Sequence, residues 1–301
     1  MISKTTCVAS ATLWCVAWTS ALQATDYYVY YLGGQSNMDG YGFVRELKDD
    51  QKELMDPVYI FHGNTSPDGA KVDGKGRWSR LQPGHGVGFK SNGKQNQYSD
   101  RFGVELSFAK EIQQQFPERK IALIKYSRGG TSIAEDAAGN FGCWEPDFDG
   151  INQYDHFLAT LRYAFAQNDI DGDGTQDRLI PSGILWMQGE SDAHYTEEIA
   201  QKYYSNLTRL MNLIRASLRQ DDLPVVIGQI SYAQKSPPSW KHGEIVRAAQ
   251  AKYAGTDPSA ALVTTTDNYG YSDPWHYDTA GYLDLGCLLY TSDAADEVDG
   301  V

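Results

Sequence analysis

The stretch YYVYYLGGQSNMDG, residues 27–40, decides the fold that we expect of this chain. Its first six residues are aromatic, β-branched or otherwise apolar, which is typical of a buried β-strand. The two glycines that follow predict a tight turn, and Ser36 stands at the mouth of that turn. A serine placed there can act as a nucleophile. Its hydroxyl is weakly reactive at neutral pH, so it needs a base, an acid that orients the base, and donors for an oxyanion.

Apolar, β-rich runs recur along the chain, with helical patterns between most of them. The runs cover residues 27–32, 121–126, 184–187, 225–230 and 261–265. The helical patterns are clearest over residues 104–116, 151–167 and 197–218. This alternation predicts a single α/β domain with a central parallel sheet of about five strands. Residues 64–100 show no periodicity, and they are either a binding loop or a mobile insertion.

Four polar clusters fall at or beyond the ends of predicted strands. They are Ser36, residues 127–132 (SRGGTS), residues 188–192 (QGESD) and residues 273–276 (DPWH). In an open α/β sheet, the carboxyl ends of the strands form the crevice where ligands bind. Segments far apart in the sequence are therefore expected to meet at one site.

Three of these motifs carry a family resemblance. GQSNM at residues 34–38, WMQGESD at 186–192 and DPWHYD at 273–278 occur in that order. Together they resemble the sialate O-acetylesterase and acetyl xylan esterase branch of the SGNH hydrolases, over about residues 27–286. The resemblance implies a three-layer, flavodoxin-like fold and hydrolysis of O-acetyl esters on carbohydrates, with no cofactor for catalysis.

The resemblance also implies roles for single residues. Ser36 matches the nucleophile and His276 the base, and a histidine suits both removal and return of a proton near neutral pH. Asp273 is the favoured orienting acid and Glu190 is its rival. The expected oxyanion donors are the backbone N–H groups of Ser36 and of Gly129 or Gly130, with Gln188 in place of the family's usual asparagine. Further candidates for contacts with the sugar are Gln35, Asn37, Trp144 and Trp275.

A second motif predicts a structural calcium site. Oxygen-bearing side chains alternate around a tight glycine turn, as a hard cation requires. They belong to Asp169, Asp171, Asp173, Thr175 and Asp177. The motif begins like an EF-hand loop, but Ile180 stands where that loop has its bidentate glutamate, so a calcium loop of the thrombospondin type fits better. The alternative is a solvated acidic turn.

Composition and the two ends complete the expectations. The formal net charge of −13, from 26 basic and 39 acidic residues, disfavours nucleic acid and anionic membrane surfaces as partners. Residues 1–24 have the pattern of a secretory signal peptide, which predicts a periplasmic or extracellular protein. Its removal leaves Cys143 and Cys287, too few for a disulfide framework.

The segment from Cys287 onward is anomalous. Its residues CLLYTS resemble the translation of a sequencing-library transposon end. We therefore predict that residues 287–301 are non-native adapter sequence, that the helical pattern stops at Gly286, that the native C-terminal helix is missing, and that the esterase domain covers residues 25–286.

The sequence thus predicts an exported serine esterase that removes acetyl groups from a glycan through an acyl-enzyme. Acetylated xylan, a sialic acid and another decorated polysaccharide all remain open as substrates, and so does the oligomeric state. Two alternatives are an SGNH lipase or thioesterase for longer acyl chains, and a catalytically silent carbohydrate-binding protein.

Overall fold

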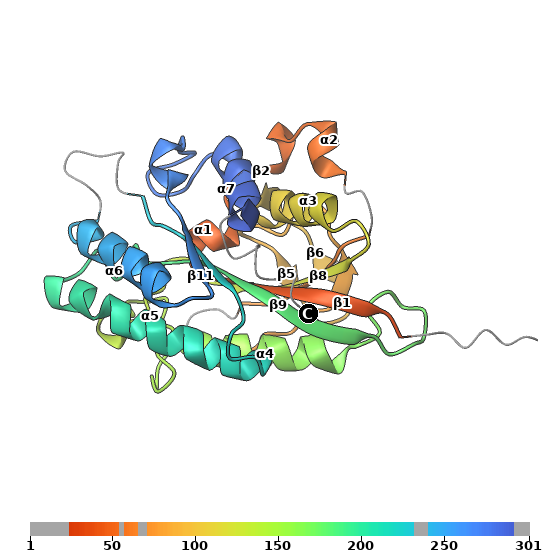
Figure 1. Cartoon of the computed structure of the whole chain (residues 1–301), viewed down its shortest axis with the longest axis horizontal. Coiled ribbons are helices and arrows are strands. Elements are labelled where there is room, and N and C mark those ends of the chain that lie inside the picture. The colour runs from red at the N-terminus through yellow and green to blue at the C-terminus, as the bar shows by residue number, and fades with distance from the viewer. Residues whose placement is uncertain (1–23, 54–56, 66–70, 232–239, 292–301) are drawn as a thin grey trace, which may run out of the picture.

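A computed structural model describes residues 24–53, 57–65, 71–231 and 240–291 (Figure 1). The predicted signal peptide lies almost entirely outside these residues, and so do residues 292–301. Among the described residues, no helix combines the length and the apolar character needed to cross a membrane.

One sheet of seven strands forms the centre of the molecule, in the order β11-β10-β9-β1-β8-β3-β4. Its strands are β1 (Asp26–Gly34), β3 (Tyr59–His62), β4 (Trp78–Arg80), β8 (Lys120–Ser127), β9 (Arg178–Met187), β10 (Val225–Gly228) and β11 (Ala260–Val263). All neighbours are parallel except β3 and β4, which are antiparallel. The α/β fold with a central parallel sheet is confirmed, and each of the five predicted runs is a strand.

The expected number of about five strands is too low, because β3 and β4 were not predicted from the sequence. Each is short, at four and three residues, and β4 lies within the glycine-rich stretch that shows no periodicity. Strands β10 and β11 also have four residues each, but the apolar runs that predicted them, residues 225–230 and 261–265, extend beyond the strands. Strands β3 and β4 lie on one side of the sheet, where β3 pairs with β8 and β4 forms the edge.

Helices cover both faces of the sheet and complete three layers (Figure 1). One face carries α3 (Glu105–Gln115) and α7 (Thr279–Thr291), and the other carries α4 (Gln153–Ala166), α5 (Glu197–Leu218) and α6 (Gly243–Thr256). The three predicted helices are present with ends within two residues of the expected ones. The apolar stripe of α5 packs into the core cluster on its side of the sheet.

Short elements connect these layers. They are α1 (Ser36–Asp39), β2 (Gly42–Phe43), η1 (Val44–Glu46), α2 (Asp49–Lys52), β5 (Lys90–Ser91), β6 (Asn96–Gln97), β7 (Arg101–Phe102), η2 (Glu135–Ala137) and η3 (Thr265–Asn268). Strands β2 and β7 pair with each other, as do β5 and β6.

The strand register places the site. Strand β1 has β8 on one side and β9 on the other, and Gly34 at its end pairs with Ser127 and with Met187. The three strands therefore end at the same level. Later strands continue outward from β9, whereas β3 lies beyond β8, so the strand order reverses at β1. Such a reversal opens a crevice at the carboxyl ends of the strands.

The C-terminal helix crosses the boundary that we drew at Gly286. Helix α7 continues to Thr291, and Leu285 and Leu289 are both buried in the core on its side of the sheet. The prediction that the helical pattern stops at Gly286 is therefore wrong, because leucines at positions i and i+4 share one helix face. The non-native origin of residues 287–301 and the loss of the native C-terminal helix stay predictions.

Candidate active site

The turn after β1 requires glycine at residue 34. Gly34 has φ +142, and a Cβ atom at this position would lie 2.0 Å from the carbonyl oxygen of Met187. Only a residue without a side chain lets β1 and β9 approach this closely. The backbone N–H of Gln35 then donates to the same carbonyl oxygen at 2.9 Å, and Ser36 follows as the first residue of α1.

Ser36 lines a pocket of about 890 Å³ at the carboxyl ends of the strands. Seven predicted site residues border it together, and all four clusters contribute. They are Gln35, Ser36, Gly129, Gly130, Glu190, Trp275 and His276. The prediction that the four polar clusters meet at one site is therefore confirmed.

His276 is paired with Asp273. The Nδ1 atom of the imidazole lies 2.7 Å from Oδ2 of the carboxylate. The other oxygen, Oδ1, accepts from the backbone N–H groups of Trp275 at 2.8 Å and His276 at 3.0 Å. Burial alone would raise the pKa of Asp273, but these hydrogen bonds and the nearby imidazole bring the pKa below its usual value. Asp273 is thus a carboxylate in a fixed orientation.

The environment favours the neutral form of His276. Burial lowers the pKa of the imidazole, Asp273 works in the opposite direction, and the positive charge of Arg101 lowers it further. The net pKa lies below the ordinary value for histidine. With Nδ1 held by Asp273, a neutral ring has Nε2 as its acceptor, which is the form that a general base needs.

Glu190 has a different partner. Its Oε1 atom accepts from Asn37 Nδ2 at 2.8 Å, and its Oε2 atom is buried with no hydrogen-bond partner among the described residues. Burial raises the pKa of this carboxyl. Of the two acids that the sequence left open, the structure brings Asp273, not Glu190, against the imidazole.

Asn37 does not border the pocket and is almost fully buried, so a role in sugar contact does not fit the structure. Its amide joins three segments instead. Besides Glu190, Nδ2 approaches the carbonyl oxygen of Trp275 at 3.4 Å, while Oδ1 accepts from the hydroxyl of Tyr282 at 2.9 Å. Asn37 therefore fastens the turn that follows the nucleophile to the histidine loop and to α7.

Gly129 lies directly beside the nucleophile. A Cβ atom at this glycine would be 3.3 Å from Cβ of Ser36. Within the described part of the chain, the backbone N–H groups of Ser36 and Gly129 donate to no other protein group. Two donors at the serine are thus left for an oxyanion.

Gln188 is not a third donor in this structure. Its side chain is fully buried and does not border the pocket. Its Nε2 atom donates to Asp192 Oδ2 at 2.6 Å and to the carbonyl oxygen of Thr131 at 3.2 Å, while Oε1 accepts from the hydroxyl of Tyr203 at 3.0 Å. The prediction for Gln188 therefore fails, because its amide is already used within the core.

Of the two tryptophans predicted to contact the sugar, one is buried in the core and the other borders the pocket. Trp144 is fully buried, belongs to the core, and donates through Nε1 to Thr131 Oγ1 at 3.1 Å, so it cannot stack on a sugar. Trp275 borders the pocket and is 51% exposed. Gln35 also borders the pocket, where its Oε1 atom accepts from the N–H of Gly189 at 3.3 Å.

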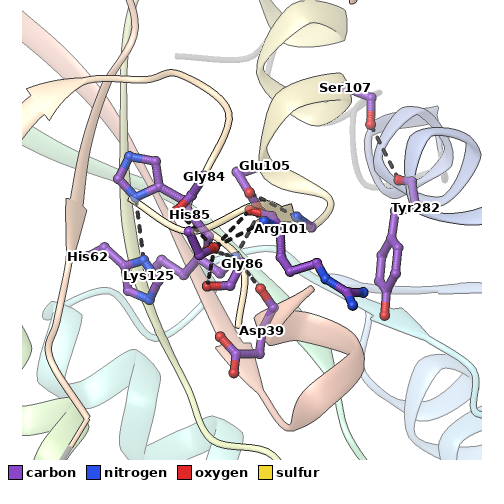
Figure 2. Close-up of polar contacts among 12 residues, drawn as sticks. Asp39, His62, Gly84, His85, Gly86, Arg101, Glu105, Ser107, Lys125 and Tyr282 are labelled. Carbon is purple, nitrogen blue, oxygen red and sulfur yellow. Dashed lines mark hydrogen bonds and ion pairs between the residues drawn. The ribbon is translucent and has the colours of Figure 1, made fainter. Parts of the chain in front are cut away.

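A buried lysine, which the sequence analysis did not single out, holds Asp39 at the end of the nucleophile turn (Figure 2). Lys125 of β8 donates through Nζ to the carbonyl oxygens of Asp39 and His85 and to Glu105 Oε2, each at 2.8 Å. Neither the Lys125 side chain nor the Glu105 side chain is exposed to solvent. All three ammonium protons have acceptors, which a fully buried lysine requires. A lysine within the apolar run IALIKY was the signal available in the sequence.

The acidic loop lies before β9. Carboxylate oxygens of Asp169, Asp171 and Asp177 come within 4.8 Å of one another, a spacing that suits a hard cation. The carboxylate of Asp173 is not in this group; its Oδ1 atom accepts from the N–H of Thr175 at 2.7 Å. The calcium site stays a prediction.

Comparison with known families decides the identity of the fold and the activity. A family model described as carbohydrate esterase, sialic acid-specific acetylesterase, matches residues 26–293. The chain belongs to this carbohydrate esterase family. It is therefore a carboxylic ester hydrolase that acts on O-acetylated carbohydrate, as the motifs predicted. A search of curated proteins found no match.

Solved structures share the fold at low sequence identity. A protein from Arabidopsis thaliana is 19% identical with a TM-score of 0.61, and the match covers 92% of this chain and 99% of that one. NanS is 16% identical with a TM-score of 0.58, covering 90% and 98%. A carbohydrate acetylesterase from Xanthomonas citri is 18% identical with a TM-score of 0.57, covering 90% and 57%.

Proposed function

We propose that this esterase removes acetyl groups from a glycan through an acyl-enzyme formed on Ser36. His276 takes the proton of the serine hydroxyl while Oγ attacks the acetyl carbonyl carbon. Asp273 holds the imidazole and stabilises its cationic form. The N–H groups of Ser36 and Gly129 then stabilise the oxyanion. His276 returns the proton to the leaving sugar alcohol, and water releases acetate by the same steps.

One observation carries this proposal. His276, held at 2.7 Å by Asp273, borders the same pocket as Ser36 and Gly129. Nucleophile, base, orienting acid and oxyanion donors are the complete set that hydrolysis of an ester by serine requires.

The mouth of the pocket supports a carbohydrate as the substrate. Three aromatic side chains that border it are unusually exposed, namely Phe141 at 43%, Tyr195 at 45% and Trp275 at 51%. Flat apolar rings open to solvent are suited to stacking against the C–H faces of a sugar. We infer that the acetyl group enters the pocket while the sugar rests on these rings.

Acetate release from a panel of acetylated glycans, with acetylated xylan and O-acetyl sialic acid among them, tests the proposal. Ser36→Ala is the control, and we expect it to abolish release at unchanged melting temperature. Retention of activity in Ser36→Ala would exclude the serine mechanism. Hydrolysis of p-nitrophenyl acetate that disappears in Ser36→Ala would exclude a silent binding protein. A preference for long acyl esters would favour the lipase or thioesterase alternative.

The stacking role has its own test. Trp275→Ala should raise KM for a polymeric substrate about three- to tenfold, with little change in kcat, since a lost stacking contact contributes roughly 1 kcal/mol. Phe165→Ala is the matched control, because Phe165 is also an exposed ring at 37% but does not border the pocket. Equal effects of both substitutions would contradict the stacking role.

Export through the predicted signal peptide is part of the proposal as an expectation. An extracellular or periplasmic location would bring the enzyme to polysaccharides that do not enter the cytoplasm. Recovery of the mature chain with an N-terminus near residue 25 would support it.

A further inference from the structure

A tyrosine lies flat against the base of the active site. The rings of Tyr41 and His276 have centroids 3.5 Å apart and planes that differ by 5°. Tyr41 belongs to the loop between α1 and β2, and it borders the same pocket as Ser36. Its hydroxyl lies 3.9 Å from the point where a Cβ atom of Gly129 would be. The ring therefore spans from the imidazole toward the oxyanion donors.

Asp273 alone does not fix the plane of the imidazole. A hydrogen bond to Nδ1 holds one atom of the ring, while rotation about the bond that joins the ring to Cβ is broadly permitted for histidine. A parallel aromatic ring at van der Waals distance restricts this rotation. With both contacts in place, Nε2 has one direction in which to accept a proton.

Tyr41 is itself held in place. Its carbonyl oxygen accepts from Arg101 Nη1 at 2.6 Å, and the next residue, Gly42, pairs with Phe102 of β7. Burial raises the pKa of the Tyr41 hydroxyl to about 12, so the ring is neutral at working pH. The face of a neutral aromatic ring carries partial negative charge and attracts a cation that lies over it.

We propose that Tyr41 is a positioning residue for proton transfer, which fixes the plane of the His276 imidazole and stabilises the imidazolium. This inference rests on the proposed function. In the step concerned, the proton passes from Ser36 Oγ to His276 Nε2 as Oγ bonds to the carbonyl carbon. The same proton then goes to the leaving alcohol oxygen as the ester C–O bond breaks.

Charged groups around the imidazole set the background for a pH test. Asp273 raises its pKa and Arg101 lowers it, while Asp39, Arg128, Glu190 and His194 border the same pocket. Replacing Tyr41 by leucine retains all six of these residues and keeps apolar volume over the ring, but removes the aromatic face. We expect the imidazolium to be less stable and the acid limb of kcat/KM to move to lower pH.

The experiment compares three variants on p-nitrophenyl acetate. Tyr41→Leu should lower kcat by about 10- to 100-fold with KM within about threefold, and should move the acid limb by about half a pH unit. Tyr41→Phe keeps the ring and should retain kcat within about threefold, with the limb unmoved. Phe89→Leu removes a ring stacked on His62 at 4.1 Å outside the pocket, so it should lower the melting temperature but not move the limb.

Three results would overturn the inference. One is a kcat of Tyr41→Leu within threefold of the wild type. Another is a loss in Tyr41→Phe equal to that in Tyr41→Leu, which would assign the effect to the hydroxyl. The third is an equal loss and an equal shift in Phe89→Leu, which would show general loosening.

A measurement without substrate separates this inference from the proposed function. NMR titration of the His276 imidazole, assigned by the signal lost in His276→Asn, should give a lower pKa in Tyr41→Leu than in the wild type. An unchanged pKa would refute stabilisation of the imidazolium. If instead Ser36→Ala retained acetate release, the proposed function would fail while the titration still reported on the stacked ring.

Discussion

The roles of the two acids can be separated by one amide substitution at each. In Asp273→Asn, the amide oxygen should stay at the position of Oδ1, where the N–H groups of Trp275 and His276 donate at 2.8 and 3.0 Å. The amide nitrogen would then face Nδ1 of His276 across the present 2.7 Å contact. Nδ1 becomes the acceptor and Nε2 carries the proton, so the imidazole can no longer accept from Ser36.

The magnitude follows from this change of tautomer. Loss of the orienting carboxylate at a serine-histidine pair lowers kcat on the order of 10³- to 10⁴-fold, or about 4–5 kcal/mol of transition-state stabilisation. In Glu190→Gln, the amide oxygen can keep accepting from Asn37 Nδ2, which now donates at 2.8 Å. Burial raises the pKa of Glu190, so loss of its charge costs less here than at an exposed site, and we expect a loss of activity below about fivefold.

The assay is acetate release under saturating substrate, with melting temperatures recorded for both variants. Glu190→Gln serves as the matched control, since it replaces the other candidate acid, which borders the pocket, by its amide. The reasoning would be refuted if Asp273→Asn kept more than about a tenth of the activity. It would also be refuted if Glu190→Gln lost as much as Asp273→Asn, because the histidine would then depend on both acids.

Three further predictions concern stability. Lys125→Met leaves the buried Glu105 carboxylate unpaired, so unfolding in urea should show a loss of about 3–5 kcal/mol, and Lys125→Met/Glu105→Gln should recover part of it; no recovery would contradict the pairing. Burial lowers the pKa of His85 to about 3. Below pH 6.5 the imidazole therefore binds a proton in the unfolded chain but stays neutral in the folded chain. From pH 7 to pH 4.5, the wild type should lose roughly 3 kcal/mol more stability than His85→Phe, and equal losses would argue against a neutral buried histidine. Calcium should raise the melting temperature by several degrees, and chelator or Asp169→Asn/Asp171→Asn should abolish the rise; a melting curve indifferent to calcium would leave the acidic loop as a solvated turn.

The layered fold was predictable because its central strands are long and apolar. The run that ends at Gly34 and the run that ends at Ser127 pair in register, so motifs at their ends had to meet. Ser36 and Gly129 could therefore be placed together from the sequence. His276 lies beyond the last predicted strand, and its role came from the family resemblance; all three residues border one pocket. Strands β3 and β4 were not predicted, and β4 has only three residues within a stretch that shows no periodicity.

Side-chain direction within a motif was less predictable. Gln188 and Glu190 are separated by one residue and both follow β9, yet only Glu190 borders the pocket. The sequence does not show that Tyr203, on α5, would engage the amide of Gln188 from the core side. The same holds for Trp144, whose partner Thr131 lies on a different segment. A motif locates a loop, whereas packing from other elements decides which of its side chains face substrate.

Lys125 shows where sequence reasoning reaches its physical limit. A charged residue in an apolar strand signals an unusual environment, since a buried ammonium needs acceptors for all its protons. Two of its three acceptors are the carbonyl oxygens of Asp39 and His85, and every residue has such an oxygen. Of the three, only Glu105, 20 residues away on α3, accepts through its side chain. Because backbone groups carry no residue identity, the support beneath the nucleophile turn could be found only once the fold had brought these segments together.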